Sequence, residues 1–449
     1  MMAGTGRQNI ILIAWVAMFL NILNWRLRDV VAGQSVGDFW DIYRIGLALL
    51  ASIITVFFIM QNSERLSRAL SLPMILLLIY SCVALLSASL VISKVSFYSM
   101  WKAIELMVVT AVCLAILTHP KPAETADKAL KYILGILSLL LCIWIIEAII
   151  WPHEAFITSR GVIPYIMRGV MPIAQQNGLA FYSALVALFC VVSLYEKNRK
   201  KIHKFGIIIL LLIALTELIL SQSRTSFIGL LVAVLVFLFF SGKKKHLAVV
   251  LFISFITLVI WGASGLLLDY LKRGQEEELI LTLSGRTIAW SRAIELFKES
   301  PIFGYGFVAA ARVNILGSVH GGGMSTLHGA LFDVIVGTGL LGLIPWLFGI
   351  LIVIQRMLRI SAYSLVRKNM HLRIKHAAMM ALLSLIMVRS TTSSGLAIHD
   401  HTYMFFLAVL MYVGSINDRI RRFLSDRSIS LRDHKTNLVR RGGYVNAKM

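Results

Sequence analysis

Two kinds of residue are scarce in this sequence of 449 residues. It contains only four cysteines, and Cys82, Cys113, Cys142 and Cys190 all lie within apolar runs, so neither a disulfide framework nor the spacing of a cysteine metal site is present. Acidic residues are also few, with 22 Asp and Glu against 44 Lys and Arg. No Asp-x-Asp motif occurs in the loops that are expected to face outward. We therefore expect no bound metal ion.

Apolar residues, in contrast, make up 58% of the chain and gather in repeated runs near the ~20 residues that cross a bilayer as a helix. The strands of a membrane β-barrel would alternate in polarity, whereas these runs are apolar on all sides. The first run leads into Asn24-Trp25-Arg26 rather than a small-residue cleavage site, so we expect a retained first span and no cleavable signal peptide. The predicted fold class is an all-α polytopic membrane protein.

About twelve transmembrane helices are predicted. They lie near residues 9–24, 42–60, 71–92, 97–117, 132–151, 177–195, 205–222, 225–241, 247–264, 329–354, 376–391 and 402–416. An even number places both termini on one side, and the basic clusters at 197–204, 243–245 and 419–449 place that side in the cytoplasm. The formal charge of +22 thus belongs mostly to topology and to contact with anionic membrane lipids, and nucleic acid is not an expected partner.

The predicted organisation has three parts. Residues 1–168 form N-terminal membrane helices, 169–416 form a membrane core with a long outward loop at 265–327, and 417–449 form a basic cytoplasmic tail. Two further outward segments are longer than tight turns and contain more polar residues. They are 152–176, which contains Arg160 and Arg168, and 391–401.

The long outward loop contains a predicted amphipathic helix. Ser284 is a good helix cap, and from 286 to 298 the apolar stripe consists of Trp290, Ile294 and Phe297. Pro301 ends this helix, and a turn follows in which Gly304 and Gly306 permit backbone conformations that other residues resist.

Three basic side chains are expected to meet at the outward face. Arg224 interrupts two apolar runs, where a cation is costly without an anionic partner. Arg286 begins the loop helix, and His328 stands at the head of the next span. Each also has an ordinary structural explanation, because Arg224 can snorkel to lipid phosphate, Arg286 can be solvated and His328 can be an interfacial histidine.

The other ionisable candidates are less specific. His320, His399 and His401 are interpreted as loop residues. Lys102 and Glu105 lie three residues apart on one helix face and can neutralise each other. The acids Glu147 and Glu217 lie inside spans, where ionisable groups often have a function.

Four segments make the sequence similar to a known family. QQNGLAFYSALVALF, SQSRTSFIGLLVAVLVF, SGRTIAWSRAIELFKESPIFGYGF and LHGALFDVIVGTGLLGLIPWL resemble, in order and spacing, the O-antigen ligase and polymerase superfamily of bacterial envelope glycosyltransferases. The resemblance covers about residues 170–355. It implies that Arg224, Arg286 and His328 form the active site, with Asn177 and Ser223 in support. One departure is Gly329, which stands where the family commonly has Asn.

The resemblance also implies a reaction. The donor would be a glycan on undecaprenyl pyrophosphate at the periplasmic face of the bacterial inner membrane, and the acceptor a sugar hydroxyl of lipid A–core or of a growing polysaccharide. Arg224 and Arg286 would hold the pyrophosphate, with Arg160 or Arg168 as a further clamp. His328 would be the general base of an inverting, metal-independent transfer without a cofactor.

Two questions stay open at the level of sequence. A transporter or lipid flippase would also have many spans and in-span acids, but its polar residues should lie at mid-membrane and its halves should look alike. Here the basic candidates lie at the outer edge and the halves look unlike, which favours a transferase. A ligase and a polymerase share the same donor chemistry, so the sequence does not separate them.

Overall fold

The structure is a computed structural model that describes residues 3–25, 39–91, 96–159, 163–196, 201–263, 286–311 and 327–420. These residues are almost entirely helical, which confirms the predicted all-α class. The long or apolar helices are α1 (Ala3–Ile22), α2 (Phe39–Gln61), α4 (Leu72–Ser89), α5 (Ser96–Thr118), α6 (Pro122–Ile150), α8 (Gln176–Leu194), α9 (Lys201–Leu220), α10 (Arg224–Ser241), α11 (Lys244–Ala263), α15 (Ala330–Ala362), α17 (Met370–Ser390) and α18 (His401–Gly414).

Within the described part of the chain, nine of these helices are long and apolar enough to cross a membrane. The apolar part of α1 and the whole of α18 are shorter, at Ile10–Ile22 and His401–Gly414. Every predicted span has a helix at its position, so the multi-pass architecture is confirmed.

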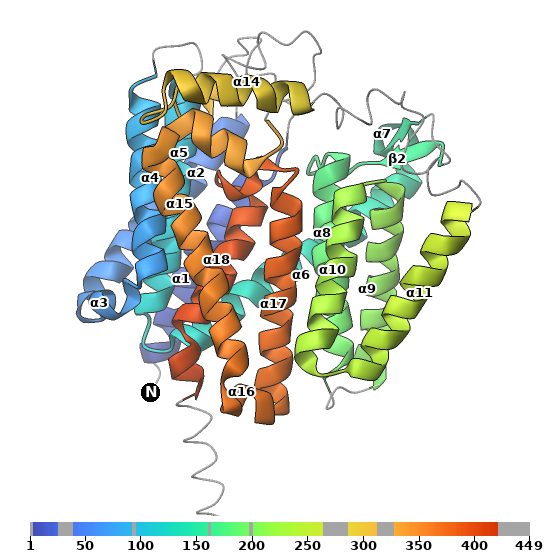
Figure 1. Cartoon of the computed structure of the whole chain (residues 1–449). Coiled ribbons are helices and arrows are strands. Elements are labelled where there is room, and N and C mark those ends of the chain that lie inside the picture. The colour runs from blue at the N-terminus through green and yellow to red at the C-terminus, as the bar shows by residue number, and fades with distance from the viewer. Residues whose placement is uncertain are drawn as a thin grey trace, which may run out of the picture.

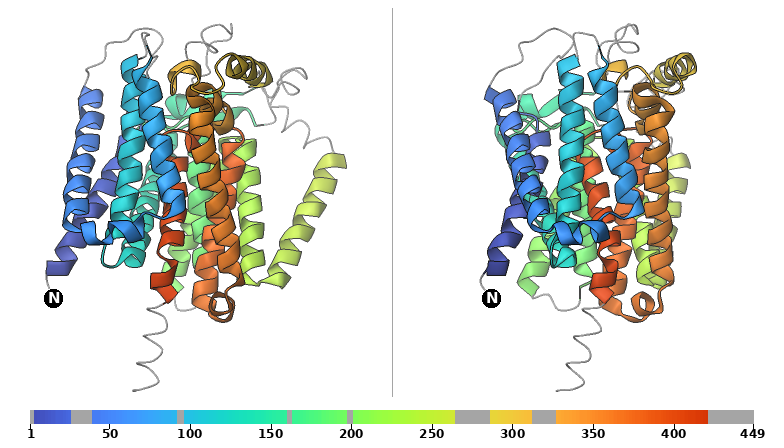
Figure 2. Two further views of the ribbon diagram at one scale, coloured as in Figure 1. Left: turned by 60° about the vertical axis from the view of Figure 1, so that its left-hand side comes forward. Right: turned by 90° about the vertical axis from the view of Figure 1, so that its left-hand side faces the viewer.

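Short elements gather at the two ends of the bundle (Figure 1). They are η1 (Ser63–Arg65), α3 (Leu66–Ala69), α7 (Pro152–Ala155), β1 (Phe156–Thr158), β2 (Tyr165–Met167), α14 (Arg286–Glu299), α16 (Ser364–Lys368) and η3 (Ser394–Leu396). Helix α14 lies across one end, called here the α14 end, where α7 and the antiparallel β1–β2 hairpin also lie. Helix α16 marks the opposite end, the α16 end. Figure 2 shows the long helices running between the two ends.

The hairpin is bound to the turn between α9 and α10. Gln222, which has a left-handed backbone with φ of 52°, donates its Nε2 amide to the carbonyls of Ile163 at 2.9 Å and Tyr165 at 3.0 Å. A left-handed non-glycine residue is retained only where its surroundings fix it. This turn is therefore held firmly, and it leads directly into Arg224.

Helices α10 and α17 pack closely against each other along their length. A Cβ atom on Gly229 would lie only 2.8 Å from Leu385 Cδ1, so the small residue permits the close approach. Near the α14 end, Thr392 Oγ1 donates to Thr225 Oγ1 at 3.0 Å. This threonine pair thus holds the start of α10 close to the end of α17.

Helix α15 bends at Gly339, which has a φ of 58°. The glycine-rich turn at 301–306 provides the hydrogen bonds that the bend removes, because the amides of Tyr305 and Gly306 donate to the carbonyls of Val336 and Gly337 at 2.8 and 3.0 Å. In return, Leu340 donates its amide to the Pro301 carbonyl at 2.8 Å. The span predicted near 329–354 is present, and the bend within it is a feature that the apolar run did not indicate.

The segment at 391–400 corrects a prediction. It was expected to be an outward turn, but most of it is buried, and His399 and His401 are only 2% and 3% exposed. Tyr80 Oη donates to the Ala397 carbonyl at 2.5 Å and Trp346 Nε1 to the Leu396 carbonyl at 3.0 Å. These bonds compensate for burying irregular backbone. His399 lies in this irregular segment, as predicted for a loop residue, although it is buried. His401 begins α18, so its interpretation as a loop residue is wrong. His320 lies outside the described residues.

Helix α14 begins at Arg286 as predicted, while Ser284 lies outside the described residues. Its packed face consists of Ala289, Ala293 and Leu296, and Ile294 is 43% exposed. The predicted apolar stripe is therefore wrong in placing Ile294 on the packed side, because the small alanines permit close contact with α15 and the larger residues flank them.

Candidate functional site

Arg224 is the first residue of α10, at the α14 end. Ser223, just before it, donates its hydroxyl to Asn177 Oδ1 at 3.1 Å, and this bond joins the start of α8 to the start of α10. The structure thus brings together three of the predicted residues, with Asn177 and Ser223 fixing the position of the backbone from which Arg224 projects.

Arg286 is the first residue of α14 and is half-buried. Burial lowers the pKa of its guanidinium, and the positive charge of Arg224 lowers it further. The two arginines, which are 62 positions apart in the sequence, therefore lie close enough to repel each other. A like-charged pair of this kind is stabilised when an anion binds between its members.

His328 precedes α15 in a strained, left-handed conformation with φ of 52°. Its neighbour Leu327 accepts a 2.9 Å hydrogen bond from Trp290 Nε1, and the Trp290 ring stacks on Phe332 with centroids 4.7 Å apart. Trp290 belongs to α14 and Phe332 to α15, so contacts from both helices hold the residues on either side of His328 in position. Strain held by surrounding contacts is common at functional sites.

The pKa of His328 is lowered to about 4, first by burial and then by the positive charges of Arg286 and Arg389. The imidazole is therefore neutral near pH 7, and one of its ring nitrogens can accept a proton. The same charges place His328 in electrostatic contact with both arginines.

Arg389 is a member of the site that sequence analysis missed. It lies in the last turn of α17, with its guanidinium carbon 5.6 Å from the centroid of the Phe181 ring. Its Nε is buried and has no hydrogen-bond partner among the described residues. The sequence does contain a signal for it, namely a lone arginine at the outward end of the apolar run 376–391. A cation at such a position is costly unless it binds a partner or serves a function.

An acid lies on one side of Arg389. Asp400 accepts a 2.6 Å hydrogen bond from the His401 amide. Burial acts to raise its pKa, but hydrogen bonds from His401 and the charges of His401 and Arg389 outweigh burial and lower the pKa to about 2. His401 in turn shares a 2.6 Å hydrogen bond with the Tyr182 hydroxyl. Asp400 is therefore a carboxylate at neutral pH, fixed by the start of α18, and its charge interacts favourably with that of Arg389.

Gly329 stands in a crowded position. A Cβ atom there would lie 2.9 Å from Phe332 Cδ2 and 3.2 Å from Trp290 Nε1. An asparagine at this position would therefore have to displace the stacked rings. The glycine at this position, where the family commonly has Asn, thus fits the stacked Trp290–Phe332 pair, which occupies the space that an Asn side chain would need.

Gly304 and Gly306 support the site through the backbone. Their φ angles are 68° and 111°, and a Cβ atom on Gly304 would lie 2.6 Å from the Val336 carbonyl oxygen. On Gly306 it would lie 2.2 Å from Val91 Cγ2. Only glycine fits both positions, and the turn they form holds the bend of α15 that leads back toward His328.

Of the two arginines of the predicted clamp, Arg168 lies within the described residues. Arg168 follows β2 and donates its Nε to the Glu154 carbonyl at 2.7 Å, which braces the base of the hairpin. Arg160 lies outside the described residues.

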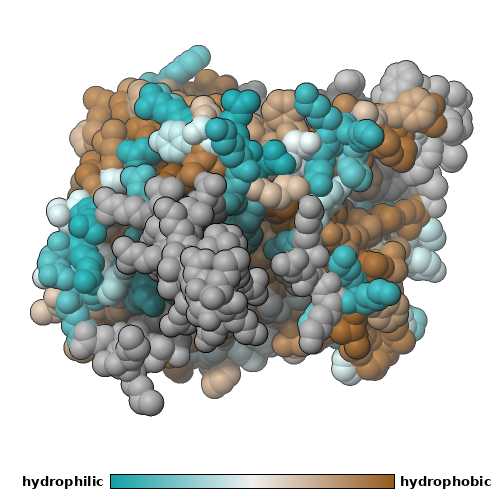
Figure 3. Space-filling view, turned by 90° about the horizontal axis from the view of Figure 1, so that it is seen from below, coloured by the Kyte–Doolittle hydropathy of each residue, from teal (hydrophilic) through white to brown (hydrophobic). Residues whose placement is uncertain are grey.

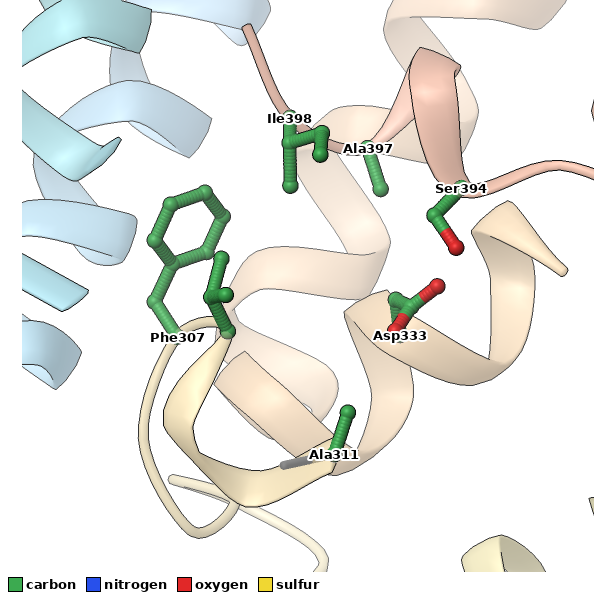
Figure 4. A pocket seen from close by; sticks show the side chains of 7 residues that line it. Phe307, Ala311, Asp333, Ser394, Ala397 and Ile398 are labelled. Atoms are coloured by element: carbon green, nitrogen blue, oxygen red, sulfur yellow. The ribbon is translucent and has the colours of Figure 1, made fainter. Parts of the chain in front are cut away.

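A small cavity lies beside the bend of α15, between this helix, the turn at 307–311 and the segment at 394–398. Figure 4 shows the side chains of Asp333 and Ser394 pointing toward each other across it. Its volume of about 10 Å³ is the size of one water molecule, so it is too small to hold a sugar ring.

The site residues fall mostly within a segment that matches a known family. The family model described as O-antigen ligase matches residues 208–347, which include Arg224, Arg286 and His328 but not Arg389. A search of curated proteins finds no match for the chain. The predicted resemblance is confirmed for this segment: residues 208–347 are similar to the O-antigen ligase family.

Proposed function

We propose that this protein transfers a glycan from undecaprenyl pyrophosphate to a sugar hydroxyl at the periplasmic face of the bacterial inner membrane. The family supports an O-antigen ligase or polymerase type of function in general terms. The observation that carries the finer proposal is the meeting of Arg224, Arg286, Arg389 and His328, from four separate parts of the chain, at one end of the bundle.

The arginines suit a pyrophosphate group. Guanidinium forks match phosphate oxygens in geometry and charge, and the repulsion among clustered arginines is relieved when a dianion lies between them. Pyrophosphate is a stabilised leaving group, so fixed cations suffice to support its departure, and the proposed transfer is metal-independent. Neither a divalent ion nor a nucleotide enters the proposed reaction.

His328 is the proposed general base. A neutral ring nitrogen takes the proton of the acceptor hydroxyl, the oxygen attacks the anomeric carbon, and the bond from that carbon to the pyrophosphate oxygen breaks. Attack opposite the leaving group inverts the anomeric centre, and the lipid pyrophosphate leaves as an anion held by the arginines. The donor's negative charge also raises the pKa of His328 from its low value, which makes it a stronger base once the donor is bound.

The proposal places the α14 end outside. Lys298 on α14 and Lys201 at the start of α9 are exposed at opposite ends of the bundle. In a cysteine-free background, Lys298→Cys should react with an impermeant thiol reagent in intact spheroplasts, and Lys201→Cys should react only after lysis. The opposite pattern would place the site in the cytoplasm and contradict the proposal.

A transporter or flippase is the alternative. A transporter is expected to have its substrate site near the membrane midplane. The proposed site lies at helix ends instead, since Arg224 and Arg286 begin their helices and Arg389 lies in a last turn. This position favours transfer at a surface over passage through the bundle.

The decisive experiment is reconstitution of the purified protein with a lipid-pyrophosphate glycan. Lipid A–core is offered as acceptor in one reaction and a second lipid-linked repeat in another. Consumption of lipid A–core identifies a ligase and chain growth identifies a polymerase. No new glycosidic bond with either acceptor, together with movement of the donor between leaflets, would support the flippase instead.

A further inference from the structure

A basic cavity of about 630 Å³ lies at the α16 end, far from the proposed site. It is bounded by the end of α10 on one side and by the elbow that joins α15, α16 and α17 on the other. Aromatic residues, serine hydroxyls and three cations line it, among them Phe239, Phe240, Ser361, Arg367, Lys368 and Arg373. Figure 3 views this end of the molecule, where hydrophilic groups border the hydrophobic flank of the bundle.

The charges of this cavity are of one sign. None of the described residues that line it is acidic. Within the part of the chain that the structure describes, no acidic group lies within ion-pair distance of Arg367, Lys368 or Arg373. Three clustered cations without a carboxylate favour an anionic ligand.

Arg373 is held in position by weak contacts that leave it able to bind. Its Nη1 donates to the Arg367 carbonyl at 3.4 Å and its Nη2 to Met370 Sδ at 3.2 Å. The Nε is buried and has no hydrogen-bond partner among the described residues. The guanidinium also lies against Gly242, the left-handed cap that ends α10. A phosphate oxygen would supply the strong acceptor that this side chain lacks.

The aromatic wall adds a second requirement. Phe239 is 66% exposed on the flank of α10, a helix that is long and apolar enough to cross a membrane. A ligand that satisfies both walls must carry an anionic head and an apolar tail. We propose that the cavity binds the phosphate headgroup of an anionic glycerophospholipid, with Arg367, Lys368 and Arg373 around the phosphate and an acyl chain along Phe239.

This site would join the two helices that carry Arg224 and Arg389 at their opposite ends. Helices α10 and α17 both border the cavity, and they pack against each other from there to the α14 end. A lipid that binds only the folded protein stabilises it. The inference requires only that the chain spans a bilayer, and it does not depend on the transfer reaction.

The test places the full-length protein in nanodiscs of phosphatidylcholine alone or of phosphatidylcholine mixed with phosphatidylglycerol. The thermal midpoint and the lipid retained in native mass spectrometry are measured. We expect the wild type to retain phosphatidylglycerol and to unfold at a higher temperature in the mixed discs. The triple variant Arg367→Gln, Lys368→Gln, Arg373→Gln should lose both effects, with phosphatidylglycerol affinity reduced about tenfold or more.

The matched control removes three exposed cations from the same end but outside the cavity, as Lys201→Gln, Lys244→Gln and Lys245→Gln. It should behave as the wild type. Equal losses in the two triple variants would overturn the proposal in favour of general surface charge, and full stabilisation by inorganic phosphate alone would assign the cavity to a soluble anion. Should the first triple variant not fold, Lys368→Glu changes one exposed side chain, and unaltered lipid retention in it would also count against the site.

Discussion

Two groups of charged residues in this protein differ in how their charges are balanced. Inside the bundle, Glu105 binds Lys102 at 2.6 Å and Arg44 at 3.5 Å, and His399 lies 3.6 Å from the same carboxylate. At the α14 end, the charges that act on the pKa of His328 are those of Arg286 and Arg389, and both are positive. Arg224 in turn lies close enough to Arg286 to lower its pKa. The first group pairs its cations with a carboxylate, whereas the cations of the second repel one another.

The difference separates a structural role from a binding role. A buried carboxylate that contacts two cations satisfies them, so the prediction that Lys102 and Glu105 neutralise each other is confirmed. Glu147 is likewise structural, since it accepts the amides of Val170 and Met171 at 3.1 Å. Cations that repel one another are maintained at a cost in stability, and such a cost is typical of sites that bind an anion.

The largest expected effect comes from His328→Ala. If His328 is the general base, turnover should fall by about 10²–10⁴-fold while donor binding survives, because the arginines remain. Turnover and donor binding are measured separately on the reconstituted enzyme. His153→Ala, at an exposed position on α7, is the control and should retain turnover. Unchanged turnover in His328→Ala would leave His328 as a structural residue at the head of α15.

Disruption of the buried group around Glu105 should lower the free energy of unfolding. Glu105→Gln removes the carboxylate that Lys102 and Arg44 share, and breaking a buried ion pair costs about 3–5 kcal/mol because a charge is left without compensation. Thermal unfolding in detergent measures the loss. The matched control is Glu295→Gln, which breaks the exposed pair with Arg292 and should cost less than about 1 kcal/mol. Similar losses in both variants would show that the buried group has no special structural role.

Replacing the arginines by lysine should produce a smaller effect on donor use. Arg224→Lys and Arg389→Lys keep the charge but lose the planar fork, so each should reduce kcat/KM for the donor by the equivalent of about 1–3 kcal/mol. Arg292→Lys, on the exposed face of α14, serves as the control. Full activity of Arg224→Lys would indicate that Arg224 only snorkels to lipid phosphate. Full activity of Arg389→Lys would indicate that Arg389 does not take part in donor binding.

The smallest effect concerns pH. Protonation removes the base, so the rate falls as pH drops through the pKa of His328. This fall forms the acidic limb of the pH–rate profile. In the profile of kcat/KM, which reports the free enzyme, the midpoint of the acidic limb should lie near pH 4 rather than at the ordinary histidine pKa of 6.5. For kcat it should lie at higher pH, because the bound pyrophosphate raises the pKa.

Arg389→Gln removes one positive charge beside His328 and should move the kcat/KM limb upward. Rate measurements across pH on wild type and variant check both shifts. A limb that stays at 6.5 in every case would show that His328 is not in this electrostatic environment.

Sequence patterns were sufficient for much of the fold and for part of the site. Span positions follow from apolar runs, because a helix in a bilayer satisfies its own backbone and needs only apolar side chains. Arg224, Arg286 and His328 were identified through motif spacing, and their pKa interactions agree with a shared location. Arg389 was missed because it lies beyond the matching motifs and resembles an ordinary residue at the end of a span.

The amino-acid sequence by itself determined that the chain is a helical membrane protein and that residues 208–347 resemble the O-antigen ligase family, since composition, run length and motif order are local properties. Only the tertiary structure decided that α15 bends at Gly339, that the segment at 391–400 turns inward and that Arg389 meets His328. These features depend on partners far away in the chain, such as the turn at 301–306 for the bend and Tyr80 and Trp346 for the buried carbonyls. A hydrogen bond between residues hundreds of positions apart leaves no periodicity in the sequence, so it becomes visible only when the helices are packed.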